Sequence, residues 1–432
     1  MNSSNEPKLV RGISRLDMVA ITINSIIGAG IFGLPSKAAA LIGANSLFAF
    51  IGCAFVVALI VLCFAEVSSR FTETGGPYLY AKEAFGSVVG FEVGWLFWLV
   101  RITAFATNCN LLVNYLGFAN NQFARVITIL LVVLALSVIN LVGVKTSART
   151  TNFFTVGKLI PLLVFVLIGL FFINPQNLTF SAEIDSASFA QTVLVLIYAF
   201  TGFEMAVVPS GEMKEPRKNL PFALLTAIAI VAALYILIQI VCIGTLPELA
   251  TSERPLADAA SHFLGTYGAA FIIVGATISI SGNLNSLLLS ASRIPFAMSE
   301  QGELPNALAK THANFKTPYV SIILTAVIML IFTIQTSFLT ALTISTITRL
   351  LVYAATCASL PVFRSREQSP KAEFLAPLGV AAAIASLVLI GWLLYNVKFD
   401  EVKVLAVCAS IGLIIYFVYS FVKKWQIGET KR

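Results

Sequence analysis

Long apolar stretches recur along the whole chain and constrain its fold more than any other feature. Hydrophobic residues make up 58% of the 432 residues and charged residues only 11%, against about 25% charged residues in a typical globular protein. Inside a bilayer every backbone N–H and C=O group needs a partner within the protein, so apolar stretches of about 20 residues fold as helices. The chain is therefore predicted to be an all-α membrane protein.

Hydropathy predicts twelve membrane-spanning segments. They cover residues 16–43, 45–69, 84–117, 123–142, 150–173, 188–210, 219–246, 264–297, 318–335, 338–361, 374–396 and 401–422. The six cysteines all lie in these apolar segments, without metal-ligand spacing, and are interpreted as small buried hydrophobic residues.

Lysines and arginines are distributed unevenly between the two sets of predicted loops. With the N-terminus in the cytoplasm, 20 of the 28 fall on the cytoplasmic side, three lie within spans and five lie outside. This is the distribution that the positive-inside rule describes. It predicts that both termini are cytoplasmic, in a protein of the cell membrane. It also explains the net charge of +7 without a nucleic-acid partner.

The first predicted span contains a glycine-rich interruption. Gly28, Gly30 and Gly33 lie within six residues, and Pro35 follows. A glycine costs a helix about 1 kcal/mol relative to alanine, and irregular backbone at membrane depth is tolerated only where it is buried in protein or lines a cavity. Two interpretations stay open: a ligand site made of main-chain groups, or close helix packing through small residues.

The sixth predicted span contains a second interruption, at residues 198–204, followed by Pro209 and Gly211. Spans one and six therefore begin two five-span units of opposite orientation, and spans 11 and 12 are additional. Interrupted helices at matching positions of two halves are the best sequence indication of a binding site in a secondary transporter.

Main-chain groups at the two interruptions are predicted to bind a zwitterion. A helix N-terminus exposes unpaired N–H groups and a partial positive charge. The outer half of the first span begins at residues 29–31, so these N–H groups can bind a carboxylate. Carbonyl groups near Ile26, Ile27 and residues 198–201 can accept hydrogen bonds from an ammonium. An α-amino acid satisfies both sets.

Several motifs resemble the amino acid–polyamine–organocation superfamily, with the closest likeness to its bacterial amino acid permeases. They are IIGAGIFGLP (26–35), AEVSSRFTETGGPYLYAKEAFG (65–86), YAFTGFEM (198–205), EPRKNLP (215–221) and SRIPFAMSEQGELP (292–305). The resemblance covers about residues 10–365. It implies a LeuT-type fold of five plus five inverted helices, with helices 1 and 6 broken, and transport by alternating access.

The resemblance implies a domain organisation and a set of substrate-binding residues. The core would span 16–361, in two repeats of about 16–173 and 188–361, between tails at 1–15 and 423–432 and with two extra helices at 374–422. Ala29 and Gly30 would hold the substrate carboxylate, while Ile26, Tyr198 and Thr201 carry the ammonium. Phe105 and Leu287 would shape the side-chain pocket. The neighbours of the breaks complete the predicted set: Ile27, Gly28, Ile31, Ala199 and Gly202.

Five ionisable residues lie inside or near the predicted spans: Glu66, Arg101, Lys158, Glu204 and Arg349. A buried charge costs at least about 2.5–3.5 kcal/mol, so each marks a functional hypothesis. In several members of the superfamily a lysine at the position of Lys158 occupies the place of a sodium ion. It could bridge spans one and eight near Gly28 and residues 279–281, and loss of its proton would couple to transport. The alternative is a fixed structural cation.

The other four ionisable residues have paired interpretations. Glu204 is either a gate or proton carrier, or a buried carboxylate satisfied by Arg101 or by backbone. Arg101 and Arg349 are interpreted chiefly as members of scaffold ion pairs. Glu66 is interpreted as structural or as part of an inner gate.

These features together favour a sodium-independent amino acid transporter that works by proton symport or by exchange. The predicted pocket positions carry no acidic side chain apart from nearby Glu204, which favours a neutral L-amino acid. Sodium coupling on the same fold and a sensor role are alternatives. A membrane enzyme is disfavoured, because the sequence offers no nucleophile–base pair and both histidines fall in predicted loops. No cofactor and no metal site is predicted.

Overall fold

The computed structural model describes residues 14–72, 75–142, 148–181, 183–207, 210, 213–315, 317–397 and 399–429, without the side chains of 148–156, 400 and 422–429. Most of the predicted N-terminal tail, Pro209, Gly211 and residues 430–432 of the predicted C-terminal tail lie outside the described residues.

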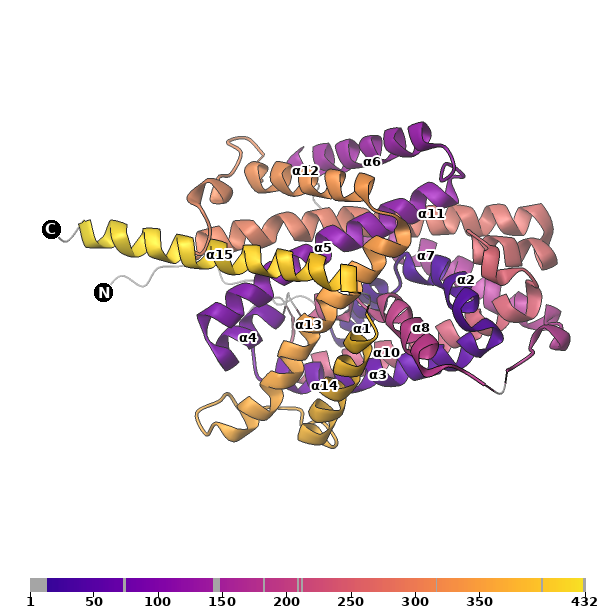
Figure 1. Cartoon of the computed structure of the whole chain (residues 1–432), viewed down its shortest axis with the longest axis horizontal. Coiled ribbons are helices and arrows are strands. Elements are labelled where there is room, and N and C mark those ends of the chain that lie inside the picture. The colour runs from indigo at the N-terminus through magenta and orange to yellow at the C-terminus, as the bar shows by residue number, and fades with distance from the viewer. Residues whose placement is uncertain are drawn as a thin grey trace.

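Each predicted span matches one helix or an interrupted pair of helices (Figure 1). In the first half these are α1 (Arg15–Ile26), α2 (Gly30–Ile42), α3 (Ser46–Ser68), α5 (Ser87–Tyr115), α6 (Gln122–Val142) and α7 (Ala148–Gly169). In the second half they are α8 (Ser186–Phe200), α9 (Phe203–Ala206), α10 (Pro216–Thr245), α11 (Pro255–Glu300), α12 (Tyr319–Gln335), α13 (Phe338–Ser365), α14 (Gly379–Tyr395) and α15 (Phe399–Glu429). Within the described residues, eight helical stretches are long and apolar enough to cross a membrane.

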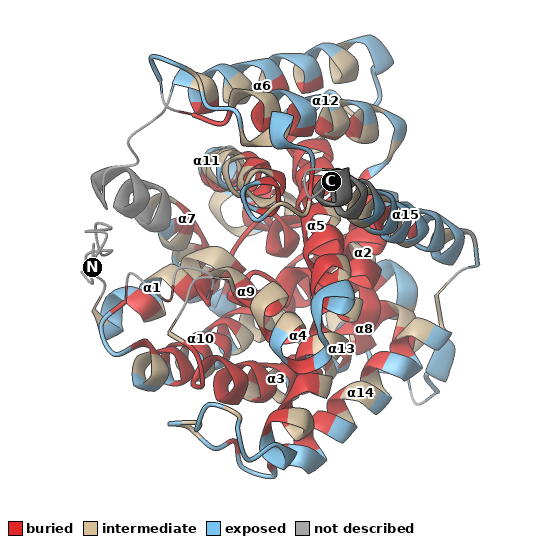
Figure 2. Ribbon diagram, turned by 90° about the vertical axis from the view of Figure 1, so that its left-hand side faces the viewer, coloured by how far each residue is buried: buried red, intermediate tan, exposed pale blue. Residues whose placement is uncertain are grey.

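Burial divides the helices into a central and a peripheral group. Helices α2, α5, α8 and α13 lie in the centre and are largely buried, whereas α6, α14 and α15 lie at the rim (Figure 2). The rim helices expose large apolar side chains, among them Leu131 on α6 and Phe417 on α15. Contiguous exposed apolar surface of this kind is lipid-facing in a membrane protein.

Polar contacts between loops fall into two separate sets, as an alternating series of spans requires. On one face Arg70 donates to the Pro370 carbonyl at 2.9 Å, and Arg217 donates to the Ser69 carbonyl at 2.9 Å. On the other face Asn45 donates to the Ser181 carbonyl at 3.1 Å. We refer to the first as the basic face, because the lysine- and arginine-rich loops meet there.

The segment between the second and third predicted spans contains a short helix that hydropathy does not predict. Gly75 and Gly76 turn the chain, with positive φ angles, and α4 then runs from Pro77 to Phe85. Proline suits the first helical position because its fixed φ is already helical and its missing N–H is not needed there. Sequence hydropathy missed α4 because it is short and amphipathic.

One further boundary differs from the prediction. Helix α11 begins at Pro255 rather than at 264 and bends at Gly265, whose φ of 63° is not helical. It therefore includes His262, for which the sequence predicts a loop.

The buried carboxylate of Glu66 accepts hydrogen bonds from Arg70, Arg364 and the Ala376 N–H. These contacts tie α3 to α13 and to the segment before α14, which agrees with the structural interpretation of Glu66.

Candidate functional site

Both predicted interruptions are present as breaks in the helices. Helix α1 ends at Ile26, Ile27 is extended with φ −71° and ψ 93°, and α2 begins at Gly30. Helix α8 ends at Phe200, Thr201 is extended, and Gly202 has a φ of 115°. A positive φ of this size is readily adopted only by glycine, which explains why the second break falls at Gly202.

The glycines at the breaks also allow the two interrupted helices to touch. A Cβ atom on Gly30 would lie 2.8 Å from the Cα of Ala199, and a Cβ atom on Gly202 would overlap the carbonyl oxygen of Ser25. Thus each break packs against the main chain of the other. The two interpretations of the glycine-rich segment are therefore not exclusive, because Gly30 packs tightly against α8 and also faces a cavity.

A cavity of about 180 Å³ lies at the meeting point of the two breaks, between α1, α5, α8, α11 and α13. A single water needs about 10–15 Å³ by the same measure, so there is room for a small solute. The wall includes three sets of half-buried residues. Ser25 precedes the break between α1 and α2, Met205 follows the break between α8 and α9, and Asn285 belongs to the stretch 282–290 of α11. The cavity therefore opens toward the basic face.

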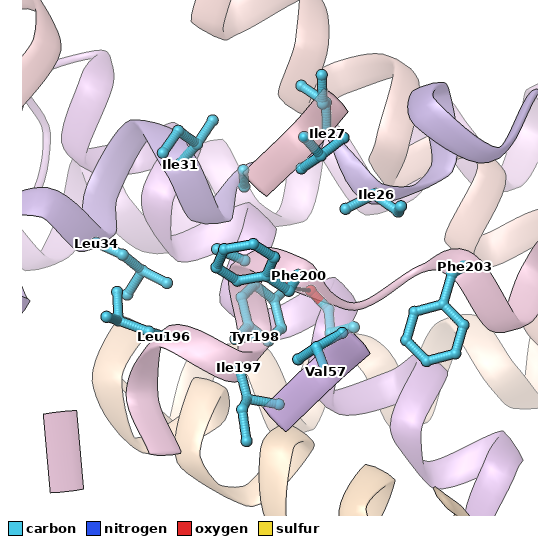
Figure 3. Close-up of a cluster of buried hydrophobic side chains, with 14 of the residues drawn as sticks. Ile26, Ile27, Ile31, Leu34, Val57, Leu196, Ile197, Tyr198, Phe200 and Phe203 are labelled. Atoms are coloured by element: carbon cyan, nitrogen blue, oxygen red, sulfur yellow. Dashed lines mark hydrogen bonds between the residues drawn. The ribbon is translucent and has the colours of Figure 1, made fainter. Parts of the chain in front are cut away.

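On the opposite side of the cavity the helices are packed tightly. The Tyr115 hydroxyl donates to the Phe32 carbonyl at 2.7 Å, and a Cβ atom on Gly33 would lie 2.8 Å from Leu111 and 3.1 Å from Phe338. Apolar side chains surround the breaks there and form a continuous buried cluster (Figure 3). This packing separates the cavity from the second face.

Most of the predicted site residues line this cavity, and some do not. Those on its wall are Ile26, Gly28, Ala29, Gly30, Lys158, Tyr198, Thr201, Gly202 and Leu287. Those outside the wall are Ile27, Ile31, Phe105, Ala199 and Glu204. Phe105 is fully buried in the core, and its neighbours Ala104 and Asn108, on another face of α5, reach the cavity instead.

A polar network on α5, α8 and α11 was not predicted. The Asn108 side chain donates to the Tyr198 hydroxyl at 2.8 Å, and Asn283 donates to Asn108 at 3.3 Å. Asn285, Ser286 and Ser290 add further polar groups along α11. Asparagine within an apolar span is the signal that could have identified this network, since polar side chains at membrane depth face a partner or a cavity.

Lys158 holds the end of α1 next to the first break. Its ammonium donates to the carbonyls of Asn24 and Ile27, both at 3.0 Å, and the residue is 4% exposed. The predicted link to span one is thus present, and the Ile27 carbonyl, which the sequence assigns to a substrate ammonium, already accepts a hydrogen bond from Lys158. On α11, where a link to span eight was expected, the Ser279 hydroxyl is buried without a hydrogen-bond partner in the described part of the chain.

Glu204 lies behind the cavity wall, between two arginines from different helices. Its Oε1 atom is 3.7 Å from Arg101 on α5 and 3.6 Å from Arg349 on α13. Its Oε2 atom accepts from the Gly202 N–H at 2.8 Å and from the Tyr353 hydroxyl at 2.7 Å. These contacts agree with the second interpretation of Glu204, a buried carboxylate satisfied by Arg101 or by backbone. The two arginines also line the cavity.

Comparisons with known proteins agree with this geometry. The model of the family described as "Amino acid permease" matches residues 13–419. A methylthioribose transporter of Bacillus subtilis is 28% identical, covering 96% of this chain and 95% of the relative. A serine/threonine exchanger of the same organism is 32% identical over 73% of this chain and 74% of its own length.

A third relative extends the range of substrates within this group. An arginine/agmatine antiporter of Chlamydia pneumoniae is 25% identical over 96% of this chain and 91% of its own length. The family match spans both helix breaks and the cavity between them, and the resemblance noted in the sequence motifs is confirmed. This chain is a member of the amino acid permease family.

Proposed function

We propose that this protein is a sodium-independent secondary transporter of amino acids that works by alternating access with proton coupling. The observation that carries the proposal is the cavity at which two broken helices meet, with a lysine ammonium on the carbonyls of the first break. Irregular backbone at membrane depth is tolerated where it is buried in protein or lines a cavity, and residues of both breaks line this cavity.

The proposed fold has twelve spans in the LeuT-type arrangement. The core at 16–361 would consist of two inverted repeats of five helices, at about 16–173 and 188–361, followed by two extra helices at 374–422. The matching positions of the breaks in α1/α2 and α8/α9 support this arrangement. The basic face would be cytoplasmic by the positive-inside rule, with both termini on that side of the cell membrane, so the cavity is open to the cytoplasm.

In the proposed complex the substrate carboxylate binds the first N–H groups of α2. These groups have no i−4 partner within the helix, and they lie at the positive end of its dipole. Ala29 and Gly30 place them on the cavity wall. The substrate ammonium would lie near the Ile26 carbonyl, which has only a long contact of 3.5 Å from the Tyr235 hydroxyl, and near Tyr198 and Thr201.

Lys158 supports sodium independence because its ammonium fills the region next to the first break. A sodium ion there would compete with it for the carbonyls of Asn24 and Ile27. Proton loss from this buried amine would leave two N–H donors but remove the charge that strengthens both hydrogen bonds, which gives a route from protonation to movement of α1. Exchange without net proton movement is the second candidate, because two of the relatives are an exchanger and an antiporter.

Uptake into liposomes tests the proposal directly. Purified protein is reconstituted, and uptake of each radiolabelled amino acid is measured with an inward proton gradient, with an inward sodium gradient, or with unlabelled amino acid inside. Uptake that follows the proton gradient and ignores sodium is expected. Uptake that requires internal amino acid would select exchange. Uptake that follows sodium alone, or no uptake of any amino acid, would overturn the proposal.

A further inference from the structure

The cavity wall carries an unbalanced positive charge at the end away from the first break. Arg101, from α5, and Arg349, from α13, are 2% and 3% exposed, and both line the cavity. They share a single carboxylate, Glu204. The cluster Arg101–Glu204–Arg349 therefore has a formal charge of +1, and no acidic residue is among the described residues that line the cavity.

Hydrogen-bond donors in this cluster are left without acceptors. Neither arginine is within hydrogen-bond distance of Glu204, since the closest approaches are 3.7 and 3.6 Å. Within the described part of the chain, Nε and Nη2 of Arg101 and Nε of Arg349 are buried without a partner. Buried charged donors are costly unless an anion and hydrogen bonds satisfy them.

The surrounding side chains hold both guanidinium groups in place. Arg101 lies over the Phe97 ring, with 4.4 Å between its Cζ atom and the ring centre. The Cζ atom of Arg349 is 5.9 Å from the centre of the Tyr198 ring. Glu204 is itself fixed by Gly202 and Tyr353, so it cannot turn to satisfy more of the donors. Both arginines line the cavity, so an anionic group there would lie next to two guanidinium groups that share one carboxylate.

We propose that Arg101 and Arg349 bind an acidic group on the substrate side chain, so that the preferred substrates are acidic amino acids such as glutamate and aspartate. This inference rests on the proposed function, which places the α-carboxylate at the start of α2. A second carboxylate then supplies acceptors for a guanidinium fork, a pairing with favourable bidentate geometry. The expectation of a neutral side chain rested on four pocket positions that did not include either arginine.

Binding of glutamate and glutamine to the purified full chain tests the inference, because the two ligands match in size and differ in charge. Affinities are measured by competition with a radiolabelled substrate in chloride-free buffer. Glutamate is expected to bind at least about tenfold more tightly than glutamine, as charge-assisted hydrogen bonds require. Equal affinities, or tighter binding of glutamine, would overturn the inference.

Substitutions then assign the preference to the cluster. Arg349→Met and Arg101→Met are each expected to reduce the ratio of glutamate affinity to glutamine affinity to near one. The control Arg293→Gln removes another part-buried arginine, which bonds the Leu289 carbonyl and does not line the cavity. It should leave the preference unchanged. An unchanged preference in both methionine variants would contradict the assignment.

Two further outcomes keep this inference separate from the proposed function. If glutamine or other neutral amino acids bind and are transported while acidic ones are not, amino acid transport stands and the acidic preference fails. If none of the twenty amino acids binds or moves, the proposed function fails first. Should an arginine variant not fold, Glu204→Gln serves instead. It adds one positive charge to the cluster and should raise the preference for glutamate over glutamine.

Discussion

The two ends of the cavity are lined by different chemical groups, main-chain groups at one end and charged side chains at the other. At the break between α1 and α2 the wall is main chain, with Gly28, Ala29 and Gly30 exposing backbone groups. At the cluster Arg101–Glu204–Arg349 the wall includes two long charged side chains, Arg101 from α5 and Arg349 from α13, and Glu204 lies behind them. The main-chain end can recognise what all α-amino acids share, whereas the side-chain end can recognise what distinguishes one amino acid from another.

This difference suggests how one family serves unlike substrates. Main-chain recognition depends on helix geometry and leaves little freedom for change, since each break packs against the other. Side chains at the second end can change without moving a helix. The relatives named above, which include a serine/threonine exchanger and an arginine/agmatine antiporter, are consistent with a common fold and variable specificity.

The largest effect is expected where the main-chain end is disturbed. Gly30→Val places a branched side chain against the Cα of Ala199, where even a Cβ atom would lie at 2.8 Å. Helix α2 must then move away from α8, and a displacement of about 1 Å at a site of this kind costs about 100-fold in rate. Liposome uptake of the preferred substrate measures the loss.

A matched control separates this effect from the general cost of valine in a helix. A Cβ atom on Gly391 of α14 would have no other atom within 4 Å, so Gly391→Val should retain transport. Because Gly30 also packs against α8, the thermal unfolding temperature of both variants must be compared. Uptake by Gly30→Val close to that of the parent chain would contradict the assignment of the main-chain groups at the first break to the substrate site.

The next effect concerns the cation that holds the main-chain end. Lys158→Met removes the donor to Asn24 and Ile27 while keeping most of the side-chain volume, so α1 loses its link to α7. Transport is expected to fall by at least about tenfold, because two charge-assisted hydrogen bonds are lost. The residual uptake should no longer respond to a proton gradient, which is measured by uptake at matched and unmatched pH.

Lys310→Met is the control for this variant, since Lys310 is an exposed lysine outside the cavity. It should transport as the parent chain does. A Lys158→Met protein that keeps the parent's response to the proton gradient would assign Lys158 to the scaffold. If the Lys158→Met variant instead gained a requirement for sodium, this would support the proposal that the ammonium of Lys158 takes the place of a sodium ion at the first break.

A smaller effect is expected at the residue that joins the two ends. The Tyr198 hydroxyl accepts from Asn108 at 2.8 Å, and the ring of Tyr198 faces Arg349. Tyr198→Phe keeps the ring and removes the acceptor of one of the two Asn108 N–H groups, the other of which bonds the Ala104 carbonyl, at a cost of about 1–3 kcal/mol. Substrate affinity should fall several-fold, measured by competition binding. Tyr395→Phe is the control, because Tyr395 is 89% exposed and does not line the cavity. Equal losses in both variants would contradict a specific role for Tyr198.

The same contrast explains what could be predicted from the sequence. The helices and both breaks follow from local properties: apolar length for the spans, and glycine within an apolar run for the breaks. The cluster around Glu204 depends on which faces of α5, α9 and α13 meet, and a single sequence does not contain that information. Arg101 and Arg349 were recognised as buried charges, but their place on the cavity wall was missed. Phe105 shows the same limit, because Ala104 and Asn108, on another face of α5, line the cavity in its place.

The smallest effect is expected on the basic face outside the cavity lining, where α4 meets the segment that follows α11. The Tyr78 hydroxyl donates to Glu303 at 2.9 Å and accepts from Lys82 at 3.0 Å, while Lys82 also pairs with Glu303 at 3.2 Å. The hydrogen bond with Tyr78 raises the pKa of Lys82 above its ordinary value of 10.5, and burial raises the pKa of Tyr78 above 10.0. Because the pKa of Lys82 is raised in the folded protein, its charged form contributes to the free energy of unfolding at all pH values below the ordinary pKa. This contribution is lost only as the pH rises through the raised pKa.

Tyr78→Phe should therefore change transport by no more than about twofold to threefold, because exposed and half-buried pairs contribute little. The ratio of variant to parent uptake should stay constant across the acidic and neutral range, since neither Lys82 nor Tyr78 changes protonation there. A pH response of the parent chain would then come from another group, and Lys158 is the one proposed. Uptake by Tyr78→Phe that diverges from the parent as the medium is acidified would place a proton-sensitive group at the contact between Tyr78, Lys82 and Glu303, and would weaken the assignment of coupling to Lys158.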